Sequence, residues 1–104
     1  MGQFKDYPNI HAMLKETIDR NFDGPAFRWF GPDGHLEQLT WGGFYEQLRQ
    51  GVGSLSALGI QKGDAINILS YSCFRWVLTD LAAVSMGAVS VGIYQSLLPP
   101  DCRY

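Results

Sequence analysis

The chain has 104 residues and a formal net charge of −2, so it can form one small domain with a modest core. Its hydrophobic content of 46% and charged content of 17% are typical of a globular protein and argue against a disordered chain. The eight Lys and Arg residues are scattered and form no basic stripe, which argues against a nucleic-acid-binding protein.

The start of the chain and its cysteines predict a cytoplasmic protein. Residues 1–6 contain no apolar signal core, and no apolar run reaches the ~18 residues that a membrane span requires. Cys73 and Cys102 form no C-x-x-C pattern. We therefore expect two reduced thiols rather than a disulfide or a metal-binding pair.

The first third of the chain predicts a helix followed by a β-hairpin. Asn9 can cap a helix that runs from about Ile10 to Phe22 and is ended by Asp-Gly-Pro at residues 23–25. Two short strands are expected at residues 26–30 and 36–40, with turn-forming residues between them. The apolar positions of the helix share one face: Ile10, Met13, Leu14, Ile18 and Phe22.

A second helix is predicted from about Trp41 to Leu58, with Thr40 as its N-cap and Gly59 at its C-terminal cap. The helix contains three internal glycines: Gly43, Gly51 and Gly53. Each glycine costs roughly 1 kcal/mol relative to alanine, so the helix needs tertiary packing to hold it. The same glycines would allow another backbone to approach closely.

The second half of the chain predicts a β–α–β unit. A strand at residues 65–70 follows a tight turn at Lys62-Gly63-Asp64. A helix from Cys73 to Met86, capped by Ser72, then leads to a strand at residues 89–94. The helical connection makes the strands parallel, with a right-handed crossover. Because the helix is apolar nearly all round, we expect it to be buried on more than one side. The fold class is α/β.

No residue pattern in the chain matches a complete catalytic or phosphate-binding motif. The nearest approach to a glycine-rich phosphate loop is Gly51-Val52-Gly53, which lies inside a helical pattern and favours helix packing. His11 and His35 each stand alone, and we expect both to be solvated. The sequence therefore offers no metal site built on histidine.

Three other polar residues lie where functional groups can occur. Ser70 and Ser72 follow a strand, but no G-x-S-x-G nucleophile elbow surrounds them, which favours a capping role. Asp80 lies in the apolar helix. It is either a partly buried acid with a functional partner or an acid that reaches water or Arg75.

Motifs from Leu39 to Tyr94 carry a family resemblance. They are Leu39-Thr40-Trp41-Gly42-x-Phe44, Leu58-Gly59-Ile60-x-Lys62-Gly63-Asp64-x-Ile66-x-Ile68-Leu69-Ser70, Trp76-x-x-x-Asp80-Leu81-Ala82 and Gly87-Ala88-Val89-x-Val91-Gly92-Ile93-Tyr94. In this order they resemble the start of the adenylate-forming acyl-CoA synthetases, the AMP-binding ligases. The resemblance extends from Ile10 onward, and residues 58–94 are its specific part.

The last residues resemble the long-chain fatty acyl branch of that family. Val91-Gly92-Ile93-Tyr94 is followed by Pro100-x-Cys102-x-Tyr104, and other branches more often place proline where Gly92 stands. The sequence also departs from the family. Gln95-Ser96 replaces a common Pro-Thr, the loop at residues 72–75 differs from an Asn-Arg-Pro-Glu type, and Gly43 removes the acidic residue of a capping box. A divergent member and a decayed copy both fit these departures.

The resemblance implies ATP-dependent fatty acid–CoA ligation through an acyl-adenylate, with ATP, Mg²⁺ and coenzyme A as cofactors of the full-length enzyme. The family's phosphate loop, Mg²⁺ site and catalytic lysine lie downstream of the matched region. No catalytic, cofactor-binding or metal-binding residue is therefore assigned here. Residues 1–104 would be a partial N-terminal region of the large domain, truncated at its C-terminal end, whose partner is the remainder of that domain. The resemblance also allows peripheral membrane association of the full-length enzyme.

Two alternatives remain open at this stage. The first is another adenylate-forming enzyme that acts on an aryl acid or an amino acid, which downstream pocket residues would decide. The second is a non-catalytic truncated paralogue that binds a partner through its exposed apolar helix. The sequence after Tyr104 would separate the enzymatic reading from the non-catalytic one.

Overall fold

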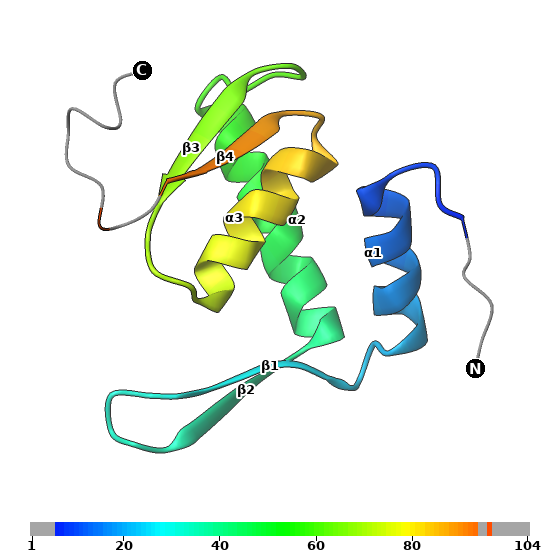
Figure 1. Ribbon diagram of the computed structural model, residues 1–104. Coiled ribbons are helices and arrows are strands. Elements are labelled where there is room, and N and C mark those ends of the chain that lie inside the picture. Colours follow the sequence, from blue (N-terminus) through cyan, green and yellow to red (C-terminus); the bar gives the residue numbers. More distant parts are fainter. Residues whose placement is uncertain (1–5, 94–95, 97–104) are drawn as a thin grey trace. The chain divides into compact units, whose positions relative to one another are not determined.

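The computed structural model describes residues 6–93 and residue 96. The chain divides into two compact units, Met1–Glu46 and Gln47–Tyr104. Figure 1 labels the helices and strands. The elements in chain order are α1 (Ile10–Arg20), β1 (Pro25–Phe30), β2 (Leu36–Thr40), α2 (Trp41–Ala57), β3 (Ala65–Leu69), α3 (Phe74–Ser85) and β4 (Val89–Ile93). The predicted α/β class and order of elements are confirmed.

Helix α1 begins where the sequence predicts and ends two residues earlier. The Asn9 side chain accepts a hydrogen bond of 2.8 Å from the Ala12 N–H, as an N-cap does. At the other end, the side-chain amide of Asn21 donates a hydrogen bond to the Thr17 carbonyl at 2.9 Å. The backbone N–H of Asn21 donates to the Thr17 and Ile18 carbonyls. These bonds end the helix at Arg20, so the predicted end at Phe22 is wrong.

Strands β1 and β2 form the predicted antiparallel hairpin, with Trp29 opposite Glu37 and Phe30 opposite Leu36. The loop between them is closed by a 2.8 Å hydrogen bond from the Gly31 N–H to the His35 carbonyl. Gly34 adopts a φ of 80°, which a residue with a side chain rarely adopts. The turn-forming residues at positions 31–34 therefore suit the backbone conformation of this hairpin loop.

An aromatic cluster holds the base of the hairpin to the first turn of α2. The Phe27 ring lies 5.2 Å from the Phe44 ring and 6.5 Å from the Trp41 ring, centroid to centroid. Trp41 and Phe44 meet edge to face at 6.0 Å, a geometry that aromatic quadrupoles favour. Phe44 is completely buried, so this cluster is the centre of the first unit's core.

Backbone groups and one side chain satisfy the N-terminus of α2. The Trp41 N–H donates to the Gly24 carbonyl at 2.9 Å, and the Gly42 N–H donates to the Phe22 carbonyl at 2.8 Å. The Gly43 N–H donates to Thr40 Oγ1 at 3.0 Å, which confirms Thr40 as the N-cap. The first N–H groups of a helix have no acceptor within the helix, and here residues that precede α2 supply their acceptors.

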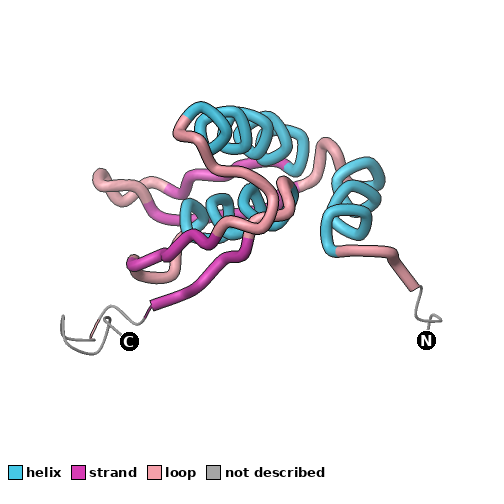
Figure 2. The backbone as a smooth tube through the Cα atoms, turned by 90° about the horizontal axis from the view of Figure 1, so that it is seen from above, coloured by secondary structure: helices cyan, strands magenta, loops and turns pink. Residues whose placement is uncertain are grey.

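In the second unit, β3 and β4 pair in parallel, with Ala65 opposite Val89 and Leu69 opposite Ile93. Helix α3 connects them and contacts both strands, which confirms the predicted β–α–β unit (Figure 2). Gly59 has a φ of 93° at the C-terminal end of α2, where the Ile60 N–H bonds the Leu55 carbonyl at 3.1 Å. The predicted glycine cap is therefore confirmed.

The internal glycines of α2 have different surroundings. A Cβ added to Gly51 would lie 3.5 Å from the Ala82 Cβ of α3, so Gly51 lies beside the neighbouring helix as predicted. A Cβ added to Gly53 would meet nothing within 4 Å, so close approach does not explain that glycine. In α3 only Ala82 and Ala83 are fully buried. Helix α3 is therefore less buried than its apolar sequence predicts.

Candidate functional site

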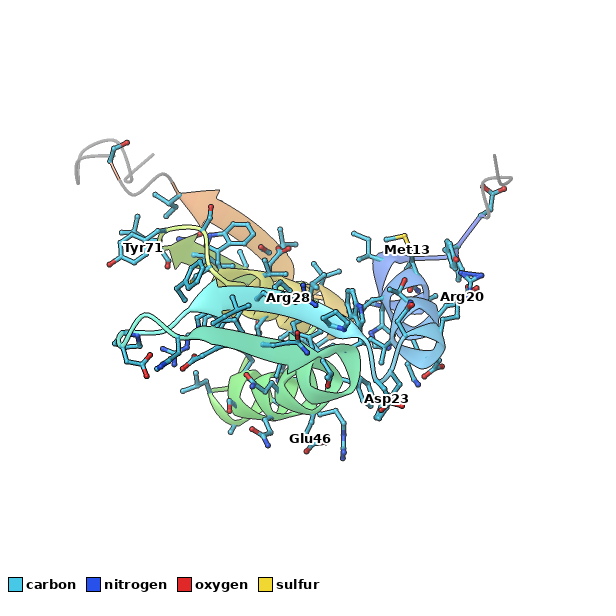
Figure 3. All side chains as sticks on the ribbon, turned by 90° about the horizontal axis from the view of Figure 1, so that it is seen from below. Met13, Arg20, Asp23, Arg28, Glu46 and Tyr71 are labelled. Carbon is cyan, nitrogen blue, oxygen red and sulfur yellow. The ribbon has the colours of Figure 1, made fainter. Side chains whose placement is uncertain are left out.

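The carboxyl ends of parallel strands are the usual location of ligands in open α/β sheets. In this chain the segment after β3 runs from Ser70 to Cys73 and leads directly into α3. All four of its residues are exposed, and the Tyr71 side chain projects into solvent (Figure 3). Ser70 Oγ donates a hydrogen bond of 3.1 Å to the Tyr71 carbonyl. This segment is the first candidate site.

Cys73, and not Ser72, is the N-cap of α3. Its φ of −156° and ψ of 171° are the extended values of a capping residue, although its thiol makes no capping hydrogen bond. The backbone N–H of Trp76 faces the sulfur and lowers the pKa of the thiol, because the thiolate would accept a hydrogen bond there. Desolvation is the next largest influence and raises the pKa, while the Arg75 N–H, the Ser70 hydroxyl and the Arg75 charge each lower it by less.

The chemistry available at this segment is limited. An exposed thiol with a lowered pKa can act as a nucleophile toward a small electrophile. Ser70 and Arg75 favour its ionised form, but neither is a general base or an orienting acid of the kind that accompanies a catalytic cysteine. The arrangement therefore supports thiol reactivity and does not by itself form a catalytic site.

Asp80 takes a structural role. Its Oδ1 accepts a hydrogen bond of 2.5 Å from the Ser90 hydroxyl, and both groups are partly buried. The bond joins the middle of α3 to β4 on the covered side of the sheet. Of the two alternatives for Asp80, the structure shows the partly buried acid, and its hydrogen-bond partner is a serine 10 residues away in the chain that the fold brings to it.

The family motif residues meet at the opposite end of the strands, where β3 and β4 begin. The Gly63 N–H donates to the Gly87 carbonyl at 2.9 Å, and the Val89 N–H donates to the Asp64 carbonyl at 2.7 Å. Gly63 and Gly87 have φ values of 90° and 79°. Asp64 Oδ2 also accepts from the Gln61 N–H at 2.7 Å. These hydrogen bonds connect the two turns that precede β3 and β4.

Gly92 is close to a tryptophan of the same unit. A Cβ added to Gly92 would lie 3.2 Å from Cζ2 of Trp76, closer than most such contacts. Glycine at this position therefore leaves room for the indole of α3 against β4. Gly92, one of the residues that carry the resemblance to the long-chain branch, is thus a packing position in this chain.

The histidines are placed as expected, at exposed positions of the first unit. His11 lies in α1, and His35 lies in the hairpin loop with Nδ1 3.4 Å from Asp33 Oδ2. Among residues 6–93 and 96, no group of three or more His, Cys, Asp or Glu side chains could hold a metal ion. In the same part of the chain, no helix is both long enough and apolar enough to cross a lipid bilayer.

The comparison with protein-family models decides the classification. Residues 14–104 match the model described as AMP-binding enzyme. The chain belongs to this family. The matched region begins inside α1 and contains every motif from Leu39 to Tyr94, so the resemblance in the sequence is confirmed.

Curated relatives of this AMP-binding family member are named long-chain-fatty-acid–CoA ligases. The chain is 31% identical over 91 residues to heimdall of Drosophila melanogaster, which covers 84% of this chain and 13% of that protein. It is 34% identical over 101 residues to ACSBG2 of Mus musculus, covering 91% and 14%. It is also 34% identical to FadD15 of Mycobacterium bovis, covering 95% and 16%. The chain thus spans about one seventh of these relatives.

Solved structures show the same fold. The anthranilate CoA ligase AuaEII in complex with anthranoyl-AMP aligns with a TM-score of 0.78 at 25% identity, over 95% of this chain and 18% of that chain. The N-terminal domain of FACL13 from Mycobacterium tuberculosis aligns with a TM-score of 0.79 at 26% identity, over 90% and 23%. CmiS6 aligns with a TM-score of 0.84 at 22% identity, which shows the fold alone.

Proposed function

We propose that this segment belongs to an ATP-dependent long-chain fatty acid–CoA ligase that forms acyl-CoA through an acyl-adenylate. The observation that carries the proposal is the group of relatives named for this activity, at 31–34% identity over 84–95% of this chain. The substrate would be a long-chain fatty acid, and ATP, Mg²⁺ and coenzyme A would serve the longer enzyme.

The segment's own part in this function is scaffold. The sequence contains no glycine-rich phosphate loop, and the described residues include no cluster of metal ligands. No reaction step is therefore assigned to these residues. What the segment contributes is the first parallel strand pair and its covering helix, joined by the family motif residues at the start of both strands.

The test uses the longest reading frame that contains this sequence. The encoded protein should form acyl-CoA and release pyrophosphate when it is given ATP, Mg²⁺, coenzyme A and palmitate. The 104-residue chain alone should show no ATP–pyrophosphate exchange, because it lacks the phosphate loop. Exchange by the isolated chain, or a longer protein that is inactive with every carboxylic acid, would contradict the proposal.

A second candidate is an enzyme that adenylates an aryl acid. The alignment with the anthranilate CoA ligase, at 25% identity and a TM-score of 0.78, favours it. The same assay separates the two candidates when anthranilate and benzoate are compared with palmitate. A preference for the aryl acids in kcat/KM would replace the fatty acid proposal. A reading frame that stops after Tyr104 would instead favour the non-catalytic paralogue.

A further inference from the structure

Two Asp-Gly pairs occur in this chain, at Asp23-Gly24 and Asp33-Gly34. In such a pair the backbone nitrogen of glycine can attack the side-chain carboxyl carbon of aspartate, because glycine has no side chain to obstruct the approach. Both pairs lie in the first unit. The first is in the loop between α1 and β1, where Figure 3 labels Asp23, and the second is in the hairpin loop between β1 and β2. The two pairs therefore share their local chemistry and differ in their structural surroundings.

The Asp33 carboxyl group is held against the peptide that follows it. Its Oδ1 accepts a hydrogen bond of 3.1 Å from the His35 N–H, and its Oδ2 lies 3.4 Å from His35 Nδ1. The ring that the first bond closes contains the Asp33–Gly34 peptide, as in an Asx-turn. The folded loop therefore keeps the carboxyl carbon beside the Gly34 nitrogen.

Little holds the Gly34 backbone in place. Its N–H donates to the Gly31 carbonyl at 3.0 Å, residues 32–35 are exposed, and a Cβ added to Gly34 would meet nothing within 4 Å. Exposed loop tips open locally at a low cost in free energy, so this N–H can leave its acceptor while the strands stay paired. Water also reaches this peptide from outside the loop.

The Gly24 backbone is held on both sides. Its N–H donates to the Asn21 carbonyl at 2.7 Å, and its carbonyl accepts from the Trp41 N–H of α2 at 2.9 Å. A Cβ added to Gly24 would lie 3.2 Å from the Asn21 carbonyl oxygen, so the surroundings are also crowded. Rotation of the Asp23–Gly24 peptide would break a bond that satisfies the N-terminus of α2.

We propose that Asp33 isomerises to isoaspartate through a succinimide, and that the fold directs this reaction to Asp33 and away from Asp23. The Gly34 nitrogen bonds to Asp33 Cγ, and the carboxyl group and the N–H together release one water. Water then adds to the ring at one of two carbons. Addition at the main-chain carbonyl carbon breaks its bond to the nitrogen, so the chain then runs through Cβ and Cγ and a new α-carboxyl group is formed. Addition at Cγ restores aspartate.

Isomerisation would alter the hairpin as well as residue 33. It places one additional carbon atom in the backbone between Gly31 and His35, whose N–H and carbonyl are joined at 2.8 Å. The last strand pair before this loop is Phe30 opposite Leu36. The isomerised protein should therefore lose strand pairing at this end of the hairpin first.

The test follows the protein encoded by the longest reading frame that contains this sequence during incubation at neutral pH. Isoaspartate is located by peptide mapping and counted with an isoaspartate-specific methyltransferase and a labelled methyl donor. Because two hydrogen bonds hold Gly24 and one holds Gly34, isomerisation at Asp33 should be about fivefold or more faster than at Asp23. Asp33→Glu should remove most of the signal, since glutamate would have to close a larger ring. Asp23→Glu is the matched control and should leave the signal.

Urea-unfolded protein separates the effect of the fold from that of the local sequence. There the two pairs should isomerise at similar rates, because neither glycine is held. Equal rates at the two sites of the folded protein, or a faster rate at Asp23, would overturn the proposal. So would a preference for Asp33 that persists unchanged in urea, because the local sequence would then be its cause. The measurement uses no substrate, so its outcome does not depend on ligase activity.

Discussion

The two units of this chain differ in how far each closes its own core. In the first, the hairpin and the start of α2 share an aromatic cluster around the fully buried Phe44. In the second, α3 covers one face of the β3–β4 pair and the other face is open. The motifs that best identify the family lie in the second unit. The motifs that identify the family therefore lie in the unit whose strand pair has one open face.

The largest expected effect tests the closed core of the first unit. Phe44→Ala should lower the free energy of unfolding by about 3–5 kcal/mol, because it leaves a cavity where the Phe27 and Trp41 rings meet. Phe30→Ala is the control, since Phe30 is exposed at the end of β1. Urea unfolding followed by tryptophan fluorescence measures both, and equal losses for the two variants would show that the cluster contributes little.

A pair of glycine substitutions tests the turns of the second unit. Gly87→Ala should destabilise the chain by about 1–3 kcal/mol, because Gly87 has a positive φ and its added Cβ would lie 2.9 Å from Lys62 Cγ. Gly53→Ala should stabilise it by about 1 kcal/mol, since that helical position is open. Thermal melts followed by circular dichroism should show shifts of opposite sign. Shifts of the same sign would contradict the turn geometry.

The hydrogen bond between Ser90 and Asp80 gives a smaller effect. Ser90→Ala should cost about 1 kcal/mol, because it leaves a partly buried carboxylate without that donor. A double-mutant cycle with Asp80→Asn isolates the interaction from the separate effects of the two substitutions. A coupling free energy near zero would mean that the carboxylate is satisfied by water instead. Ser56→Ala, at an exposed position of α2, is the control.

The smallest structural effect concerns the Cys73 thiol. Because its pKa is lowered, the thiolate fraction near neutral pH should exceed that of an unperturbed cysteine, so alkylation by iodoacetamide should reach half its maximal rate at a lower pH. The measurement uses Cys102→Ser to leave one thiol, with urea-unfolded protein as the reference. A midpoint that is the same in folded and unfolded protein would remove the predicted influence of the α3 N-terminus.

Local chemistry was predictable from the sequence where neighbouring residues decide it. Thr40 and Gly59 cap α2 as expected, since each acts within a few residues of its own position. The end of α1 was predicted two residues late, because the Asn21 side chain competes with helix continuation. Cys73 took the capping role expected of Ser72, although cysteine is a poor capping residue. The sequence held no signal for that exchange.

Contacts between residues far apart in the chain could not be predicted from the sequence. The bond between Asp80 and Ser90 depends on the exact placement of α3 on β4, which periodicity does not give. The apolar patterns of β3 and β4 predicted strands, but they did not tell which face would be covered and which open. The expectation that this segment contains no catalytic, cofactor-binding or metal-binding residue stays a prediction.

The paired turns at the start of β3 and β4 restrict where the family can change length. The Gly63 N–H bonds the Gly87 carbonyl, and the Asp64 carbonyl accepts from Val89, so the two turns fix the strand register before either strand begins. An inserted residue at that end would displace every side chain of one strand to the opposite face. Insertions and deletions between relatives should therefore accumulate at residues 70–73, a loop that overlaps the departure from the family pattern at residues 72–75.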